Sequence, residues 1–192
     1  MILEMLYAAL LIFIMEFADK TMIATVLFGV RSRRYLTVLL ISVAAFLSAN
    51  TIAVILASTI STFLSNRKVL MLIASVAFIV AGLISLRKSS EPTQQSIRLT
   101  SIAVFTGIFA SELGDKTQLT VLGLTLTFNW VVAILGATIG YTVLNGLVLT
   151  LSKKAFEVLK YSEEKVKFYS SLMLIVLGVV IAVITVLNIF PW

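Results

Sequence analysis

The sequence predicts an all-α integral membrane protein, with six transmembrane helices arranged as two inverted three-helix repeats. Three observations lead to this prediction. Of the 192 residues, 60% are hydrophobic and only 12% are charged, a composition far from that of water-soluble proteins. The apolar residues form six segments, each long enough to cross a hydrocarbon layer of about 30 Å. A charged hexapeptide in the first segment also recurs in the fourth.

The six predicted spans follow one another with short polar or basic connections. The first is expected to belong to the mature protein instead of forming a secretory signal, because it begins with Glu4 and lacks a small-residue cleavage site before Glu16. The polar stretch 87–96 is expected to be a cytoplasmic linker between a first repeat, residues 1–86, and a second, residues 97–192. The spans are Ile2–Val30, Tyr35–Leu64, Val69–Leu86, Ile97–Phe128, Trp130–Leu151 and Phe168–Ile189.

Basic residues predict the orientation of these spans. Retained loops carry an excess of Lys and Arg, so the basic first, third and fifth loops are expected to be cytoplasmic, with both termini external. Lipid headgroups facing these loops account for the net charge of +6 without a nucleic-acid partner. The odd loops contain Arg31, Arg33, Arg34, Arg87, Lys88, Arg98, Lys153, Lys154, Lys160, Lys165 and Lys167, whereas the even loops contain only Arg67 and Lys68.

The composition also excludes several kinds of site. The chain contains no Cys and no His, which removes disulfides, iron–sulfur ligation, zinc fingers and imidazole-based catalysis. Any chemistry must therefore use carboxylates, lysines, hydroxyls and amides. No prosthetic group is expected.

An internal repeat is the most informative feature of the sequence. Glu16–Thr21 (EFADKT) recurs 96 residues later as Glu112–Thr117 (ELGDKT). The same offset places the second span on the fifth and the third on the sixth. Because a unit of three crossings is followed by its copy upside down, the repeat is expected to be inverted. Each motif lies about 20 Å from the start of its span, so we expect both to meet near the middle of the membrane.

The charges of the two motifs indicate an ion site. On a continuous helix, the Glu and Asp of a motif would share one face. Ionisable groups near the bilayer centre cost about 2.5–3.5 kcal/mol each and usually mark an ion or proton path. A purely structural alternative, in which each Glu pairs with the Lys four residues later, leaves Asp19 and Asp115 without partners. Four carboxylates and two lysines leave a net charge of −2, which one divalent cation would cancel.

Oxygen ligands favour hard cations such as Ca²⁺, Mn²⁺ and Mg²⁺. Glu16 and Glu112 are also the expected proton carriers, and Lys20 and Lys116 are expected to balance charge in the empty site. Gly114 is expected to permit a helix break in the second motif. The predicted ligands are Glu16, Asp19, Thr21, Glu112, Asp115 and Thr117, with Asn50, Gln118 and Asn145 as accessory oxygens, although Asn residues in spans more often join helices.

The doubled Glu-x-Gly-Asp-(Lys/Arg)-(Thr/Ser) motif resembles the signature of the GDT-type family of Ca²⁺/Mn²⁺:H⁺ exchangers, within the lysine-exporter superfamily. Residues 112–117 match this pattern fully, and Ala18 replaces the Gly in the first copy. The resemblance covers nearly the whole chain through its six-span layout. It implies a plasma-membrane antiporter that exports Mn²⁺ or Ca²⁺ in exchange for protons, by alternating access, with the acidic residues as the site and the cation as cargo.

Three other functions remain open. The chain could export another small substrate, such as a basic amino acid, or act as a non-transporting assembly subunit whose buried charges pair with a partner. An intramembrane protease with an Asp19–Asp115 dyad is disfavoured, because Glu112 stands where such proteases have Gly. The sequence does not determine the oligomeric state, and it is compatible with a homo-oligomer.

Overall fold

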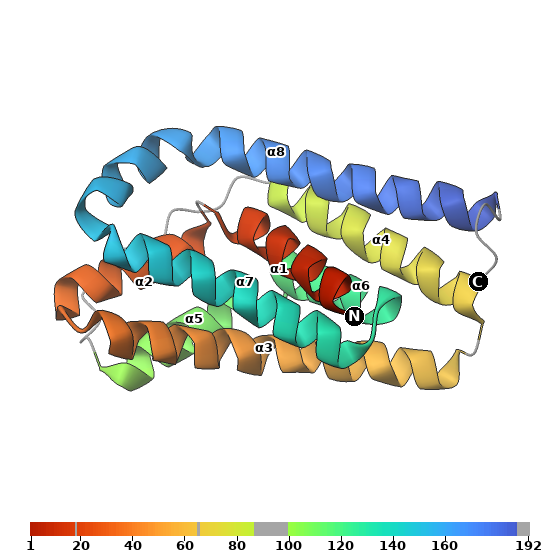
Figure 1. The fold of residues 1–192 in the computed structure, drawn as a ribbon, viewed down its shortest axis with the longest axis horizontal. Helices are drawn as coiled ribbons and strands as arrows, with labels where there is room; N and C mark the ends of the chain where they lie inside the picture. Colours follow the sequence, from red (N-terminus) through yellow and green to blue (C-terminus); the bar gives the residue numbers. More distant parts are fainter. Residues whose placement is uncertain (18, 65, 87–99, 188–192) are drawn as a thin grey trace.

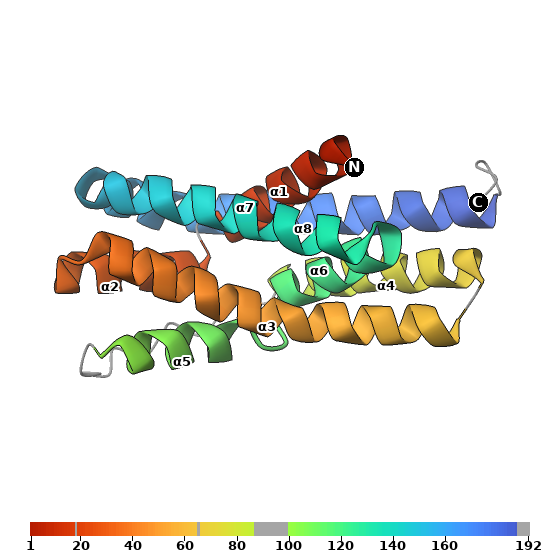
Figure 2. The same ribbon diagram turned by 60° about the horizontal axis from the view of Figure 1, so that its bottom comes forward.

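The computed structural model describes residues 1–17, 19–64, 66–86 and 100–187, with the backbone alone at residues 20 and 152–167. These residues form helices and no strand, and Figures 1 and 2 show the helices running roughly along one long axis. The all-α membrane class is confirmed, because α3, α4, α7 and the Phe168–Val186 part of α8 are each long and apolar enough to cross a membrane. The helices are α1 (Ile2–Glu16), α2 (Lys20–Ser32), α3 (Tyr35–Phe63), α4 (Arg67–Leu86), α5 (Ser101–Glu112), α6 (Lys116–Thr127), α7 (Trp130–Thr150) and α8 (Ser152–Val186).

The hydropathy pattern predicted most helix ends correctly, but it predicted a loop at one place where the structure has a helix. The second, third and fifth predicted spans agree with α3, α4 and α7 to within two residues at each end. The expected loop before Phe168 is wrong, since α8 already begins at Ser152. Residues 152–167 contain no Gly or Pro and are rich in Lys and Glu, which favour a helix regardless of their polarity.

The first and fourth predicted spans are not continuous helices. The first consists of α1 followed by α2, and the fourth of α5 followed by α6, with both breaks inside the repeated motifs. The backbone leaves the helix in nearly the same way at both places, with φ/ψ of −62°/126° at Phe17 and −66°/120° at Leu113. Asp19 and Asp115 then precede the next helix with φ/ψ of −82°/162° and −80°/167°.

Gly114 adopts a backbone conformation with positive φ, which glycine accommodates without strain. Its φ is +74°, a region that residues with a side chain rarely adopt. The break expected at this residue is therefore present. The first motif is also broken, although the corresponding residue, Ala18, lies outside the described residues.

The α4–α8 contact repeats with the same offset of 96 residues as the motifs. A Cβ atom at Gly82 would lie 2.8 Å from the carbonyl oxygen of Ser171, and one at Gly178 would lie 2.6 Å from that of Ser75. Each residue of the first pair lies 96 positions from its counterpart in the second. Figure 1 shows these helices antiparallel. Their close approach uses glycine in the way that is common between membrane helices.

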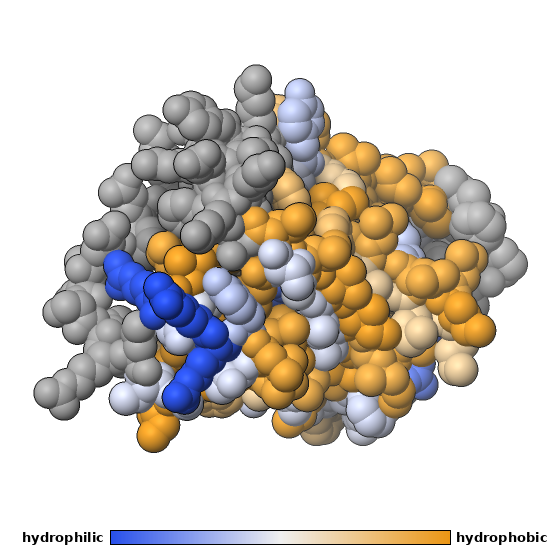
Figure 3. All heavy atoms as spheres, turned by 60° about the vertical axis from the view of Figure 1, so that its left-hand side comes forward, coloured by the Kyte–Doolittle hydropathy of each residue, from blue (hydrophilic) through white to orange (hydrophobic). Residues whose placement is uncertain are grey.

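The main buried cluster is formed by side chains of α1, α3, α4, α6, α7 and α8, and the outer surface is apolar. The rings of Phe46 and Tyr141 stack with centroids 4.1 Å apart, and both side chains are fully buried. Large apolar side chains are exposed on the outer faces of the long helices, as a lipid environment requires. Figure 3 shows this apolar surface ending in strongly hydrophilic side chains.

The basic residues of the predicted loops whose side chains are described lie at the surface. Arg31, Arg33 and Arg34 are exposed around the connection of α2 to α3, and Arg67 and Lys68 are exposed at the start of α4. The other basic residues of the predicted cytoplasmic loops, and the 87–96 linker, lie outside the residues whose side chains are described.

Candidate functional site

The helix breaks place the acidic residues of each motif on different elements. Glu16 is the last residue of α1 and Asp19 precedes α2, while Glu112 ends α5 and Asp115 precedes α6. The expectation that Glu and Asp share one face of a continuous helix is therefore wrong. In both motifs the backbone N–H of the Asp donates to the carbonyl oxygen of the Glu, at 3.1 Å and 3.2 Å, which closes the turn between the two helices.

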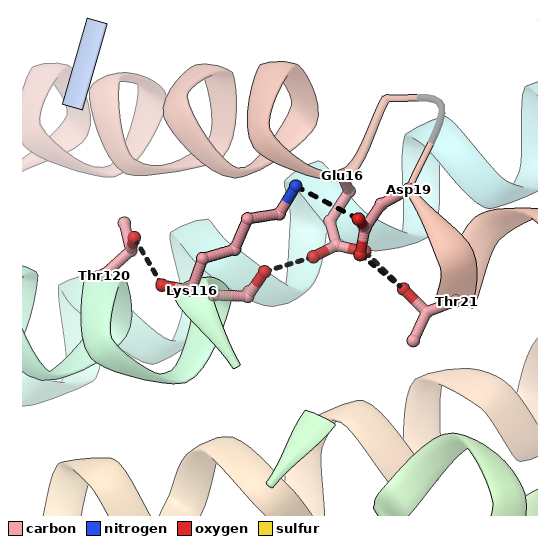
Figure 4. Close-up of polar contacts among 6 residues, drawn as sticks. Glu16, Asp19, Thr21, Lys116 and Thr120 are labelled. Carbon is pink, nitrogen blue, oxygen red and sulfur yellow. Dashed lines mark hydrogen bonds and ion pairs between the residues drawn. The ribbon is translucent and has the colours of Figure 1, made fainter. Parts of the chain in front are cut away.

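The two motifs contact each other directly (Figure 4). The Thr117 hydroxyl donates a hydrogen bond to Oε1 of Glu16, although the two residues are 101 positions apart. Nζ of Lys116 forms an ion pair with Oδ1 of Asp19 at 3.1 Å, and these side chains are only 4% and 10% exposed. Residues from both halves of the chain therefore build a single buried polar cluster.

Glu16 and Glu112 have different surroundings, although they are equivalent in the repeat. Glu16 accepts hydrogen bonds from Thr117 and, at 2.9 Å, from Thr21. Glu112 is fully buried, and neither of its carboxylate oxygens has a hydrogen-bond partner among the described residues. Thr21 also faces Glu112, but a hydroxyl has one proton and this one is directed to Glu16. The cluster therefore holds one carboxylate fixed by donors and one without them.

The four carboxylates of the two motifs interact with one another electrostatically. Glu112 interacts electrostatically with Glu16, Asp115 and Asp19. Among the described residues, no three acidic side chains are grouped closely enough to hold a metal ion together. The ammonium of Lys116 instead lies beside Asp19. The side chain of Lys20, the other expected charge-balancing residue, is outside those described.

Gln118 uses both ends of its amide to hold the second break. Its Oε1 accepts from the N–H of Gly114 at 2.7 Å, and its Nε2 donates to the carbonyl oxygen of Ala49 in α3 at 2.9 Å. Met22 has the corresponding position after the first motif and packs against Leu144 in α7. Gln118, predicted as an accessory oxygen, thus ties the second motif to α3 in this structure.

Asn50 and Asn145 make matching local contacts. Nδ2 of each donates at 3.0 Å to the carbonyl oxygen four residues earlier on its own helix, that of Phe46 or Tyr141. Both side chains are fully buried, and neither Oδ1 has a hydrogen-bond partner. The hydrogen bonds between helices that are typical of buried Asn are not formed by these two residues.

Tyr141 belongs to the site, although sequence reasoning did not identify it. Its buried hydroxyl has no hydrogen-bond partner and lies within electrostatic range of Glu112 and Glu16. Thr25 and Ser42 are nearby, but their hydroxyls donate to backbone carbonyl oxygens at 2.8 Å. A signal was present in the sequence, because Tyr141 follows Phe46 by 95 residues, the same offset as between the two Asn residues.

Comparison with known proteins agrees with the doubled motif. The model of a family described as divalent cation/proton antiporter GDT1 matches residues 4–93 and 100–188, so that each matched segment contains one motif. Curated proteins and solved structures give no significant match. The expected resemblance is confirmed: with nearly its whole length matched, this chain belongs to the divalent cation/proton antiporter GDT1 family.

Proposed function

We propose that the chain exports Mn²⁺ or Ca²⁺ from the cytoplasm across the plasma membrane in exchange for protons. The observation that carries this proposal is the direct contact of the two motifs, in which Thr117 binds Glu16 and Lys116 binds Asp19. One ion at this place would meet ligands from both halves of the chain. A site shared by two halves is what alternating access requires, because moving one half against the other changes the side from which the site is reached.

The proposed topology has six spans in two inverted repeats, with α1–α2 and α5–α6 each forming one broken span. Three features support it: the 96-residue offset of the motifs, the matching backbone angles at both breaks, and the reciprocal glycine contacts of the antiparallel helices α4 and α8. Broken helices near mid-membrane are tolerated where the irregular backbone faces a binding site.

The proposed cycle begins with the ion pair between Lys116 and Asp19. Lys116 neutralises Asp19 while no cation is present, and a divalent cation entering from the cytoplasm displaces the ammonium. Glu16, Asp19, Glu112 and Asp115 then coordinate the cation together with Thr21 and Thr117. Among the described residues no group donates a hydrogen bond to Glu112, so its oxygens are available to either a cation or a proton. Protons from outside bind Glu16 and Glu112 and displace the ion.

The test is transport by purified protein in proteoliposomes that contain a pH-sensitive dye. Wild type is expected to couple Mn²⁺ or Ca²⁺ movement to opposite proton movement, and Glu16→Gln and Glu112→Gln are expected to abolish both. Glu4→Gln is the matched control, since Glu4 lies in the first turn of α1, outside the motifs. Cation-driven proton movement that persists in both motif variants would contradict the assignment.

The Lys116–Asp19 ion pair also favours a second candidate, export of a basic amino acid, because a carboxylate of the cluster binds a primary ammonium there. Competition separates the two candidates. Excess lysine should leave Mn²⁺ transport unchanged if the cargo is a divalent cation. Lysine efflux that Mn²⁺ inhibits would instead favour the second candidate.

A further inference from the structure

Two buried amide oxygens near the motifs have no partner in the structure. Asn50 and Asn145 are fully buried, and in each the amide nitrogen is bonded while Oδ1 is not. Buried polar atoms are nearly always hydrogen-bonded, because leaving one without a partner costs about 1–3 kcal/mol. Two such atoms, 95 residues apart and so within one residue of the motif offset, therefore call for an explanation.

Asn50 lies beside the second motif. The residue before it, Ala49, accepts the hydrogen bond from Gln118, whose other end binds the N–H of Gly114 in the helix break. This chain of hydrogen bonds fixes the turn of α3 that contains Asn50 against the break between Glu112 and Asp115.

Asn145 has the corresponding position beside the first motif. The residue before it, Leu144, belongs to the same buried cluster as Met22, three residues after Asp19. One turn away from the two Asn residues, the stacked rings of Phe46 and Tyr141 join α3 to α7. The Tyr141 hydroxyl is within electrostatic range of both motif glutamates, which places this level of the two helices next to the carboxylate cluster.

We propose that Asn50 and Asn145 each supply a neutral amide oxygen to the transported cation, one from each half of the chain. This inference rests on the proposed antiport function and extends its ligand set beyond the two motifs. Side-chain amide oxygens are ordinary ligands for hard divalent cations, which bind six or more oxygens. In both Asn residues the Nδ2 bond to the helix backbone holds the amide, so that Oδ1 is left for the ion.

Two substitutions at each position separate a ligand from a structural donor. Serine keeps a hydroxyl that can donate to the carbonyl oxygen four residues earlier, as Ser48 does on the same helix at 2.7 Å, but it lacks the amide oxygen. Aspartate keeps an oxygen at the place of Oδ1 but loses the donor. The matched control is Asn129→Ser, because Asn129 is the exposed N-cap of α7 and serine is an equally good cap.

The measurements are the KM for Mn²⁺ and Ca²⁺ in proteoliposomes, Mn²⁺ binding to detergent-purified protein by electron paramagnetic resonance, and the melting temperature. Asn50→Ser and Asn145→Ser are expected to raise the KM and weaken Mn²⁺ binding at least about tenfold, since even outer partners of metal ligands contribute that much. Asn50→Asp and Asn145→Asp are expected to bind the cation at least as tightly as wild type. Melting temperatures should stay near wild type for the Ser variants.

The opposite pattern, with Ser variants like wild type and Asp variants impaired, would overturn the inference and assign the two residues to helix structure. Equal loss of binding in both variants, with a lowered melting temperature, would overturn it too. These outcomes differ from failure of the proposed function, in which wild type itself neither binds nor transports Mn²⁺ or Ca²⁺.

Discussion

Replacing Lys116 by methionine tests the role of the ion pair between the motifs. The charged atoms of Lys116 and Asp19 are 3.1 Å apart and almost fully buried. With an effective dielectric constant of about 20, their Coulomb attraction is about 5 kcal/mol, and losing one partner of a buried pair typically costs about 3–5 kcal/mol. Methionine keeps an apolar stem of similar length. We therefore expect Lys116→Met to lower the free energy of unfolding by about 3–5 kcal/mol when no divalent cation is present.

A divalent cation should reverse much of this loss, because it supplies the positive charge that Asp19 lacks in the variant. In wild type the same cation must first displace the ammonium. Mn²⁺ is therefore expected to raise the melting temperature of Lys116→Met more than that of wild type. At about 2–4 °C per kcal/mol for a chain of this size, the cation-free variant should melt roughly 6–20 °C below wild type.

The assay is thermal denaturation of detergent-solubilised protein, followed by far-ultraviolet circular dichroism, with a chelator or with Mn²⁺. Lys68→Met is the control, since Lys68 is exposed at the start of α4 and its replacement should leave both melting temperatures unchanged. If Lys116→Met is as stable as wild type without cation, or gains no more from Mn²⁺, the ion pair does not hold the empty site together.

Three further changes test separate contacts. Thr117→Val removes the hydrogen bond to Glu16 and, since hydrogen bonds to charged groups contribute about 1.5–3 kcal/mol, should lower kcat/KM for the cation about tenfold or more, whereas Thr117→Ser should transport normally. Gln118→Met introduces the residue type that the first half has at the equivalent position, Met22, and is expected to raise the KM for the cation with little change in melting temperature. An unchanged KM would show that the two hydrogen bonds of Gln118 are not needed to hold the second helix break. Gly178→Ala would place a Cβ atom 2.6 Å from a backbone oxygen of α4, so its melting temperature should fall by the equivalent of about 1–3 kcal/mol, while Gly107→Ala, with open space around it, should melt like wild type.

Hydropathy predicted the whole spans well but could not reveal the helix breaks. Hydropathy averaged over a window of residues measures how apolar a segment is, and the residues on both sides of each helix break are apolar. The only local sign of a break was Gly114, and the first motif has Ala at that place. The first break became visible only in the backbone angles of Phe17 and Asp19.

The repeat predicted that the two motifs meet, as the structure shows, but not which charges pair. Spacing along a helix suggested that Lys116 would pair with Glu112, four residues earlier. The break removes Glu112 from the helix on which Lys116 lies, so this spacing rule does not apply, and Lys116 reaches Asp19 of the other motif. Sequence spacing could not supply this pairing, because it depends on how α1, α2 and α6 pack together.

The two halves have the same order of helices but differ in how tightly their broken spans pack against the neighbouring helices. A Cβ atom at Gly136 of α7 would lie 2.6 Å from the Met5 carbonyl oxygen, and one at Gly140 would collide with Ala9, so α1 packs closely on α7. At the 96-residue offset of the motifs, these two positions fall on Leu40 and Ala44 of α3, where α3 and α5 border an open groove of about 380 Å³.

Fewer side chains are buried in α5 than in α1, and elements with few buried contacts are the first to move. Within the proposed inverted repeat, α5 is the cytoplasmic half of the fourth span, and it ends at Glu112, the carboxylate without hydrogen-bond donors. In the proposed alternating-access cycle, displacement of α5 from α3 should therefore cost less than displacement of α1 from α7. In such a movement α1 would remain on α7, and Glu16 would keep its hydrogen bonds from Thr21 and Thr117.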